Sequence, residues 1–159
     1  MRNSTLLFLI KKEDGKGAQI CLAMKKRGFG MGRWNGVGGK QNEGESIEDA
    51  VKREANEEIG ITTSTMGKVA ELAFTFPAKP DWNQLVHVYT SSEWENEPVE
   101  SEEMKPEWFG YADIPFKDMW PDDIFWLPKV LDGNLVKASF SFGEGDAILD
   151  QKVEVVKSL

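Results

Sequence analysis

Residues 38–61 read GGKQNEGESIEDAVKREANEEIGI and place three glutamates within two turns of one predicted helix. A helix advances about 100° per residue, so Glu54 and Glu58 fall within about 20° of the direction set by Ile47. Both carboxylates therefore share the apolar face of the helix, and Glu57 borders it. Burying a carboxylate is costly unless a cation meets it. The pattern predicts a divalent metal site, and hard oxygen ligands favour Mg²⁺ or Mn²⁺.

The predicted helix has a start signal and a stop signal, which set its limits near residues 46 and 59. Ser46 is a favourable N-cap, and Gly60 suits the left-handed backbone that ends many helices. Glu45 and Arg53 carry opposite charges, and we expect them to form a structural ion pair that fixes the preceding loop on the helix. That loop contains the glycine run GVGGK, which allows the backbone to approach a phosphate or a metal and frees carbonyl groups to act as ligands.

Composition is typical of one small enzyme domain. A chain of 159 residues is expected to form a single domain over residues 1–159 that buries about two thirds of its unfolded surface. The only cysteine, Cys21, lies in an alternating apolar run and predicts a buried thiol in a reducing compartment. The formal net charge of −8 opposes binding to nucleic-acid polymers, and the apolar run TLLFLI is too short to span a membrane. We expect a monomeric, cytoplasmic protein whose partner is a small anion.

The remaining pattern predicts an α/β fold, an α/β/α sandwich with a mixed β-sheet between helices. The polar stretch SSEWENEPVESEE reads as a long loop, and a strand and turn follow it. A second helix is expected over DDIFWLPKVLDG, stopped by Gly133. The other expected elements are strands at about 4–11 and 18–25 joined by a turn at 12–17, then strands at 67–76, 84–91, 135–142 and 148–156.

Two segments outside the first helix, RGFGMGRWNG and FKDMWPDDIFW, combine aromatic rings with short polar side chains. That combination suits a flat heterocycle held between rings while polar groups read its edge. Trp120 offers a stacking surface, and the Asn35 amide both donates and accepts hydrogen bonds. Asp122 and Asp123 are able to pair with ring N–H and amino groups, but Asp is also favoured as a helix cap. The sequence leaves both interpretations open.

The chain resembles the Nudix hydrolase family in one motif and in several longer segments. The motif positions that match are Gly39, Glu45, Arg53, Glu54, Glu57, Glu58 and Gly60, with Ala55 and Ile61 at the apolar positions. The segments MKKRGFGMGRWNGVGGK, PVESEEMKPEWF and IPFKDMWPDD resemble the branch that hydrolyses oxidised purine nucleoside triphosphates. This resemblance spans nearly the whole chain. It implies metal-dependent cleavage between the α and β phosphates of 8-oxo-dGTP, 2-hydroxy-dATP or O6-methyl-dGTP, which sanitises the nucleotide pool.

The resemblance also implies roles for single residues. Glu54, Glu58 and Glu103 are expected to be catalytic, and either Glu58 or Glu103 is a candidate for the base that accepts a proton from water. The implied metal ligands are the Gly38 carbonyl, Glu54, Glu57, Glu58 and, from a distant loop, Glu103. The implied substrate contacts are Thr5, Lys25, Phe29, Asn35, Phe74, Phe76, Trp120, Asp122 and Asp123, and the structural positions are Gly39, Glu45, Arg53 and Gly60.

Two other functions remain open at this stage. One is a Nudix diphosphatase for a different substrate, such as a nucleotide sugar or capped RNA, and the other is a non-catalytic nucleotide-binding module. The complete set of glutamates in the motif disfavours the second. The chain departs from the oxidised-purine branch in the first hairpin turn, EDGKGAQ, and in the segment FPAKPDWNQL, where specificity is free to differ.

Overall fold

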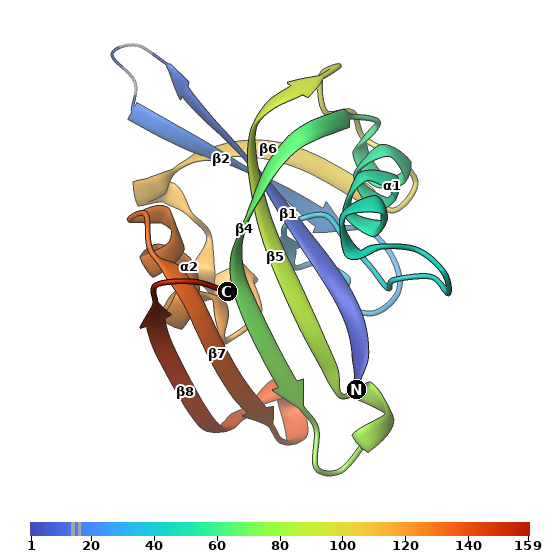
Figure 1. Ribbon diagram of the computed structural model, residues 1–159, viewed down its shortest axis with the longest axis vertical. Helices are drawn as coiled ribbons and strands as arrows, with labels where there is room; N and C mark the ends of the chain where they lie inside the picture. The colour runs from blue at the N-terminus through green and yellow to red at the C-terminus, as the bar shows by residue number, and fades with distance from the viewer. Residues whose placement is uncertain (14, 16) are drawn as a thin grey trace.

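The computed structural model describes residues 1–13, 15 and 17–159 and shows one mixed β-sheet flanked by two α-helices (Figure 1). Short 3₁₀ turns connect several of these elements, among them η1 (Pro80–Trp82), η3 (Phe116–Asp118) and η4 (Glu144–Asp146). In chain order the elements are β1 (Arg2–Glu13), β2 (Gly17–Lys25), β3 (Trp34–Asn35), α1 (Ile47–Ile59), β4 (Thr62–Thr75), β5 (Gln84–Glu95), β6 (Met104–Gly110), α2 (Asp123–Leu131), β7 (Leu135–Phe142) and β8 (Ile148–Val156).

The strand order is β3-β2-β1-β5-β4-β7-β8, and β6 also pairs with β2. The pairs β1–β5 and β4–β7 are parallel and the other pairs are antiparallel, which confirms the predicted mixed sheet. β2 pairs with β1 only as far as Cys21, so the first half of β1 has a free edge. The glycine-rich loop fills this edge through bridges from Ser4 to Lys40 and from Leu7 to Val37.

Alternating residues of β1 separate two apolar cores. Leu7 and Leu9 belong to the core under α1, whereas Phe8 and Ile10 belong to the core under α2. This is the arrangement expected of a strand whose two faces are both covered by helices. The predicted α/β sandwich is therefore confirmed, and the burial of Cys21 raises the pKa of its thiol to about 12. The helices contribute Val51, Ala55 and Ile59 to the first core and Trp126, Leu127 and Val130 to the second.

Both predicted helices are present, and the first ends as its sequence signals indicate. The Ser46 hydroxyl accepts a hydrogen bond from the Asp49 backbone N–H at 3.1 Å, and Gly60 has a φ of 72°. The second helix covers residues 123–131, which is shorter than the predicted range 122–133. Among the described residues, neither helix is long and apolar enough to cross a bilayer.

Two predicted strand limits were wrong because polar residues continue the pairing of β4 with β5. β4 begins at Thr62, and β5 runs to Glu95, so the first part of the predicted loop at 91–103 is strand. The hydroxyl groups of Thr63 and Ser91 are buried and lie 3.0 Å apart, so these polar groups find partners across the two strands. The two-residue strand β3 was not predicted, and the predicted turn at 12–17 includes residues 14 and 16, which lie outside the described residues.

Candidate active site

The glycine-rich loop lies so close to β1 that side chains would not fit. A Cβ atom on Gly38 would lie 1.8 Å from the Thr5 carbonyl oxygen, and one on Gly39 would lie 2.6 Å from Oε1 of Glu54. The Thr5 N–H donates to the Gly39 carbonyl at 2.8 Å, and the Gly38 N–H donates to Oε1 of Glu58, also at 2.8 Å. The two glycines therefore allow β1, the loop and α1 to meet, and they place backbone polar groups beside two glutamates.

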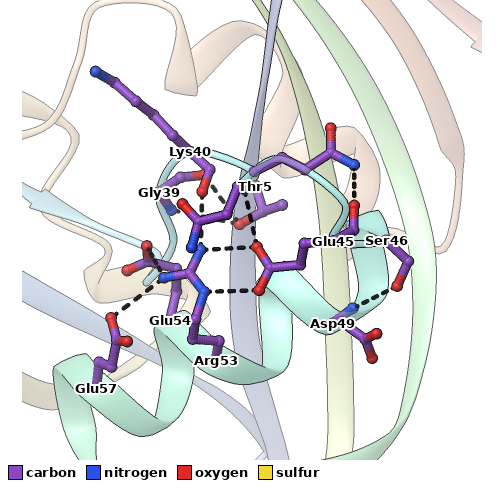
Figure 2. Close-up of polar contacts among 11 residues, drawn as sticks. Thr5, Gly39, Lys40, Glu45, Ser46, Asp49, Arg53, Glu54 and Glu57 are labelled. Carbon is purple, nitrogen blue, oxygen red and sulfur yellow. Dashed lines mark hydrogen bonds and ion pairs between the residues drawn. The ribbon is translucent and has the colours of Figure 1, made fainter.

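Arg53 fastens this loop to α1 (Figure 2). Its Nε and Nη2 donate to the two carboxylate oxygens of Glu45 at 2.8 and 3.0 Å, and Nη2 also donates to the Lys40 carbonyl at 3.0 Å. The guanidinium holds the pKa of Glu45 below its usual range. Nη1 reaches Glu54 at 2.8 Å and Glu57 at 3.3 Å, contacts that the sequence analysis did not foresee. Arg53 thus joins the loop to two of the predicted metal ligands.

Glu58 is a buried carboxylate with an unused acceptor. Only 4% of the residue is exposed, and Oε2 has no hydrogen-bond partner among the described residues. Burial raises its pKa to about 8; the Gly38 N–H and Lys25 oppose this rise, while the charges of Glu54 and Glu103 add to it. A lone buried oxygen of this kind is costly unless a proton or a cation meets it.

The predicted acidic ligands line one cavity of about 300 Å³. Glu103 reaches it from the loop before β6, where Lys25 lies 3.7 Å and Arg27 3.8 Å from its carboxylate. Among the residues that the structure describes, no three acidic groups are already gathered closely enough to hold a cation. The donor set nevertheless fits Mg²⁺ or Mn²⁺, because it offers hard oxygens and the open Oε2 of Glu58. The acidic residues of the cavity are Glu54, Glu57, Glu58, Glu102 and Glu103.

A larger cavity of about 640 Å³ adjoins the acidic one, since Arg27 and Glu103 line both. Its volume lies within the range of small-molecule sites. The Gly38 and Gly39 backbone forms part of its wall. The structure brings together here every residue that the sequence analysis proposed as a substrate contact: Thr5, Lys25, Phe29, Asn35, Phe74, Phe76, Trp120, Asp122 and Asp123.

Asp122 and Asp123 form the buried acidic end of this cavity, and each is 2% exposed. Asp122 makes no side-chain cap on α2; instead its Oδ2 accepts a hydrogen bond from Nε1 of Trp126 at 2.8 Å. Burial raises the pKa of Asp122 to about 6, against the opposing effects of the Trp126 N–H and Arg33. Burial and the neighbouring charge of Asp122 raise the pKa of Asp123 well above its usual range. Because repulsion disfavours two charges this close together, the pair resists the loss of both protons.

Aromatic rings form the outer wall of the cavity. Phe29 is 64% exposed, and its ring centroid lies 5.2 Å from that of Trp120 and 5.6 Å from that of Trp82. Phe76 stacks on Phe142 at 5.3 Å and contacts Trp82 edge to face at 5.7 Å. Exposed rings around a cavity suit a planar ligand.

Several residues that line the larger cavity carry no clear signal of this role in the sequence. Phe142 ends the alternating strand β7, and its spacing places it on the buried face, so its position was accessible from periodicity. Arg33 lies inside the RGFGMGRWNG segment, but nothing in the sequence distinguished it from a surface arginine. The lining residues that were missed include Arg2, Arg33, Gln84 and Phe142.

Known proteins resemble this chain over most of its length. The oxidized purine nucleoside triphosphate hydrolase of Mus musculus is 45% identical over 140 residues, which cover 88% of this chain and 89% of that protein. The protein of the same name from Danio rerio is 43% identical over 141 residues, which cover 89% of this chain and 90% of its own. The crystal structure of a mutator MutT protein from Bacillus halodurans superposes with a TM-score of 0.82 and 25% identity, over 97% of this chain and 98% of that one.

The NUDIX domain family matches residues 1–130, a range that holds both cavities' acidic residues and the glycine-rich loop. Because this match and the two relatives cover most of the chain, the protein belongs to the Nudix family.

Proposed function

We propose that the protein hydrolyses modified purine nucleoside triphosphates to the monophosphate and pyrophosphate, and so removes damaged nucleotides before they are polymerised. The observation that carries this proposal is the joining of two cavities: an aromatic one that ends in two buried acids, and an acidic one on the Nudix helix. A nucleotide with its base in the first would extend its phosphates toward the second. The names of the Mus musculus and Danio rerio relatives support the same substrate class.

The buried acids supply a reason for purine recognition. In such a pair, one acid kept as a carboxylate would accept hydrogen bonds and its protonated neighbour would donate one, so the two would match a base edge that carries both N–H and carbonyl groups. Exchange of the proton between the two acids would change which edge fits, which offers a route to both 8-oxo-dGTP and 2-hydroxy-dATP. Trp120 would stack on the base, and Asn35 would contact its edge.

The acidic cavity would hold Mg²⁺ through Glu54, Glu57, Glu58 and Glu103, with the Gly38 carbonyl as a further ligand. When bound, a divalent cation neutralises phosphate charge and lowers the pKa of coordinated water. Glu58 and Glu103 remain the candidates for the base that takes the proton from the attacking water.

Steady-state hydrolysis with Mg²⁺ tests the proposal, with pyrophosphate release as the readout. We expect a kcat/KM for 8-oxo-dGTP, 2-hydroxy-dATP or O6-methyl-dGTP far above that for dGTP and dATP. Asp122→Ala should reduce this discrimination by about 1–3 kcal/mol or more, since a base-reading group is lost. Slow and equal rates on all five nucleotides would contradict the base-reading site. Faster turnover of a nucleotide sugar or capped RNA would support the alternative diphosphatase, and binding without turnover would support the non-catalytic module.

The same preparations test three further expectations. We propose that Mg²⁺, or Mn²⁺ in its place, supports activity, that the protein is a monomer, and that it acts in the cytoplasm without binding nucleic-acid polymers. The formal net charge of −8 supports the last expectation, because phosphate backbones repel an acidic surface. Metal titration measures the first, light scattering the second, and cell fractionation together with a DNA-binding assay the third.

A further inference from the structure

Arg33 connects three segments that are far apart in the sequence. Its guanidinium carbon lies 4.0 Å from the centroid of the Trp120 ring, just before α2. Its Nη2 donates to Oδ2 of Asp146 at 2.9 Å, and Asp146 ends the 3₁₀ turn η4 between β7 and β8. The guanidinium thus contacts an indole face and a carboxylate at once, which restricts its position beside the ring. Arg33 thus links Trp120 to the turn between β7 and β8.

Asp146 adopts a backbone conformation that is unfavourable for most residues. Its φ is 63°, and among the described residues only Asn96 is another non-glycine residue with a positive φ. The left-handed region is unfavourable for L-residues, although Asp and Asn tolerate it better than others. Such strain is retained where the surrounding structure requires it. Here the turn aims the Asp146 carboxylate at Arg33.

Arg33 also acts on the acidic end of the cavity. It lines the cavity together with Asp122 and favours the ionised form of that residue. Its Nη1 is buried and has no hydrogen-bond partner among the described residues. The ion pair with Asp146 is about 30% exposed on both sides, so it contributes little to stability. Its position beside Trp120 and Asp122 is better explained by a role in the cavity than by a role in the fold.

We propose that Arg33 and Asp146 are positioning residues that fix Trp120 against the bound base and thereby set the selectivity of the enzyme among purines. This inference rests on the proposed function, because it assumes that the base occupies this cavity. Neither residue is required to touch the reacting phosphates. Their effect is expected in the discrimination between a modified purine and its parent, and not in the chemical step.

Two variants separate this role from a purely structural one. Asp146→Asn keeps the side-chain shape and tolerates a positive φ but removes the charge that holds Arg33. Arg33→Lys keeps the charge but loses the planar group that stacks on Trp120. Lys152→Gln is the matched control, because it removes another ion pair, with Glu154 at 3.0 Å on β8.

The first readout is the ratio of kcat/KM for 8-oxo-dGTP to that for dGTP. A structural defect lowers the fraction of active enzyme equally for both substrates, so it cancels in this ratio. We expect Asp146→Asn and Arg33→Lys to reduce the ratio roughly tenfold, through a higher KM for 8-oxo-dGTP with kcat nearly unchanged. The control should keep the wild-type ratio. Wild-type ratios in both test variants would overturn the inference and leave the proposed function intact.

The second readout does not depend on turnover. In protein labelled with 5-fluorotryptophan, the ¹⁹F resonance of Trp120 is assigned by its loss in Trp120→Phe. We expect this resonance to shift or broaden in Asp146→Asn and to stay in place in Lys152→Gln. A resonance that does not move would overturn the inference. If the wild-type enzyme showed no purine selectivity, the proposed function would fail on that result alone, and the ¹⁹F spectra would still decide whether Asp146 positions Trp120.

Discussion

Asp122→Asn should make the protein more stable at neutral pH while it impairs base recognition. Burial raises the pKa of Asp122 from 3.8 to about 6 in the folded chain. Between these two pH values the folded state keeps a proton that the unfolded state has released, so the free energy of unfolding decreases as the pH rises. The loss is complete above about pH 6. Each pH unit is worth about 1.4 kcal/mol, so ionisation of Asp122 destabilises the folded protein by about 3 kcal/mol.

An asparagine avoids this penalty, because it does not ionise and its amide oxygen is able to accept the hydrogen bond from Trp126. The change also removes the Asp122 charge that raises the pKa of Asp123, and this effect stabilises the folded protein as well. At pH 8 we expect Asp122→Asn to exceed the wild type by about 3 kcal/mol in free energy of unfolding. Near pH 4 the two proteins should be about equal, since the Asp122 carboxyl is then protonated in the folded state.

Urea denaturation at a series of pH values between 4 and 8 measures this difference. Asp150→Asn, on the exposed part of β8, controls for the loss of one carboxylate from the surface. A difference between wild type and Asp122→Asn that is constant with pH would refute the argument from burial. An Asp122→Asn protein that is less stable than the wild type at pH 8 would also refute the argument from burial. In the same preparation, reduced discrimination against dGTP would show that recognition is lost from a protein that is well folded.

Three other perturbations follow from the site. Glu58→Gln should lower kcat by roughly 10²–10⁴ without unfolding the protein, because an amide neither holds a cation as a carboxylate would nor takes up a proton, yet it keeps an acceptor for the Gly38 N–H. Steady-state kinetics and circular dichroism measure the two effects. Gly38→Ala should lower the free energy of unfolding by about 1–3 kcal/mol, since its Cβ would meet the Thr5 carbonyl. The control Gly67→Ala places its Cβ where nothing lies within 4 Å, so it should leave thermal unfolding nearly unchanged. Cys21 should react with iodoacetamide only after denaturation, because its thiol is buried with a raised pKa; rapid labelling of the native protein, seen by mass spectrometry, would contradict this.

The sequence predicted most of the fold because its elements carry independent local signals. The helix at 47–59 has an apolar face, a Ser cap and a Gly stop, and the structure contains all three. The strand limits near Thr62 and Glu95 were missed because they depend on pairing between polar segments that are distant in sequence. Propensity describes a residue and its neighbours, and it carries no information about hydroxyl groups that find partners only across a sheet.

The site residues that could be predicted are those whose charge differs from the apolar character of the surrounding sequence. Glu58 and the aspartates at 122 and 123 are acidic residues in segments that otherwise read as core, and the structure buries all of them. Arg33 and Asp146 gave no such signal. The positioning role proposed for them rests on a contact between residues 113 positions apart and on the backbone φ of Asp146. Local composition predicts neither.

The two joined cavities have one feature in common, a buried carboxyl group. At each end the chain buries a carboxyl group, raises its pKa, and leaves one oxygen without a hydrogen-bond partner among the described residues: Oε2 of Glu58 and Oδ2 of Asp123. We expect amides in place of these acids to stabilise the ligand-free protein, because burial of a carboxylate is unfavourable. A bound cation would relieve the first and a base edge would relieve the second. Ligand binding should therefore stabilise this protein more than contact area alone would indicate, since it satisfies polar groups that folding leaves unsatisfied.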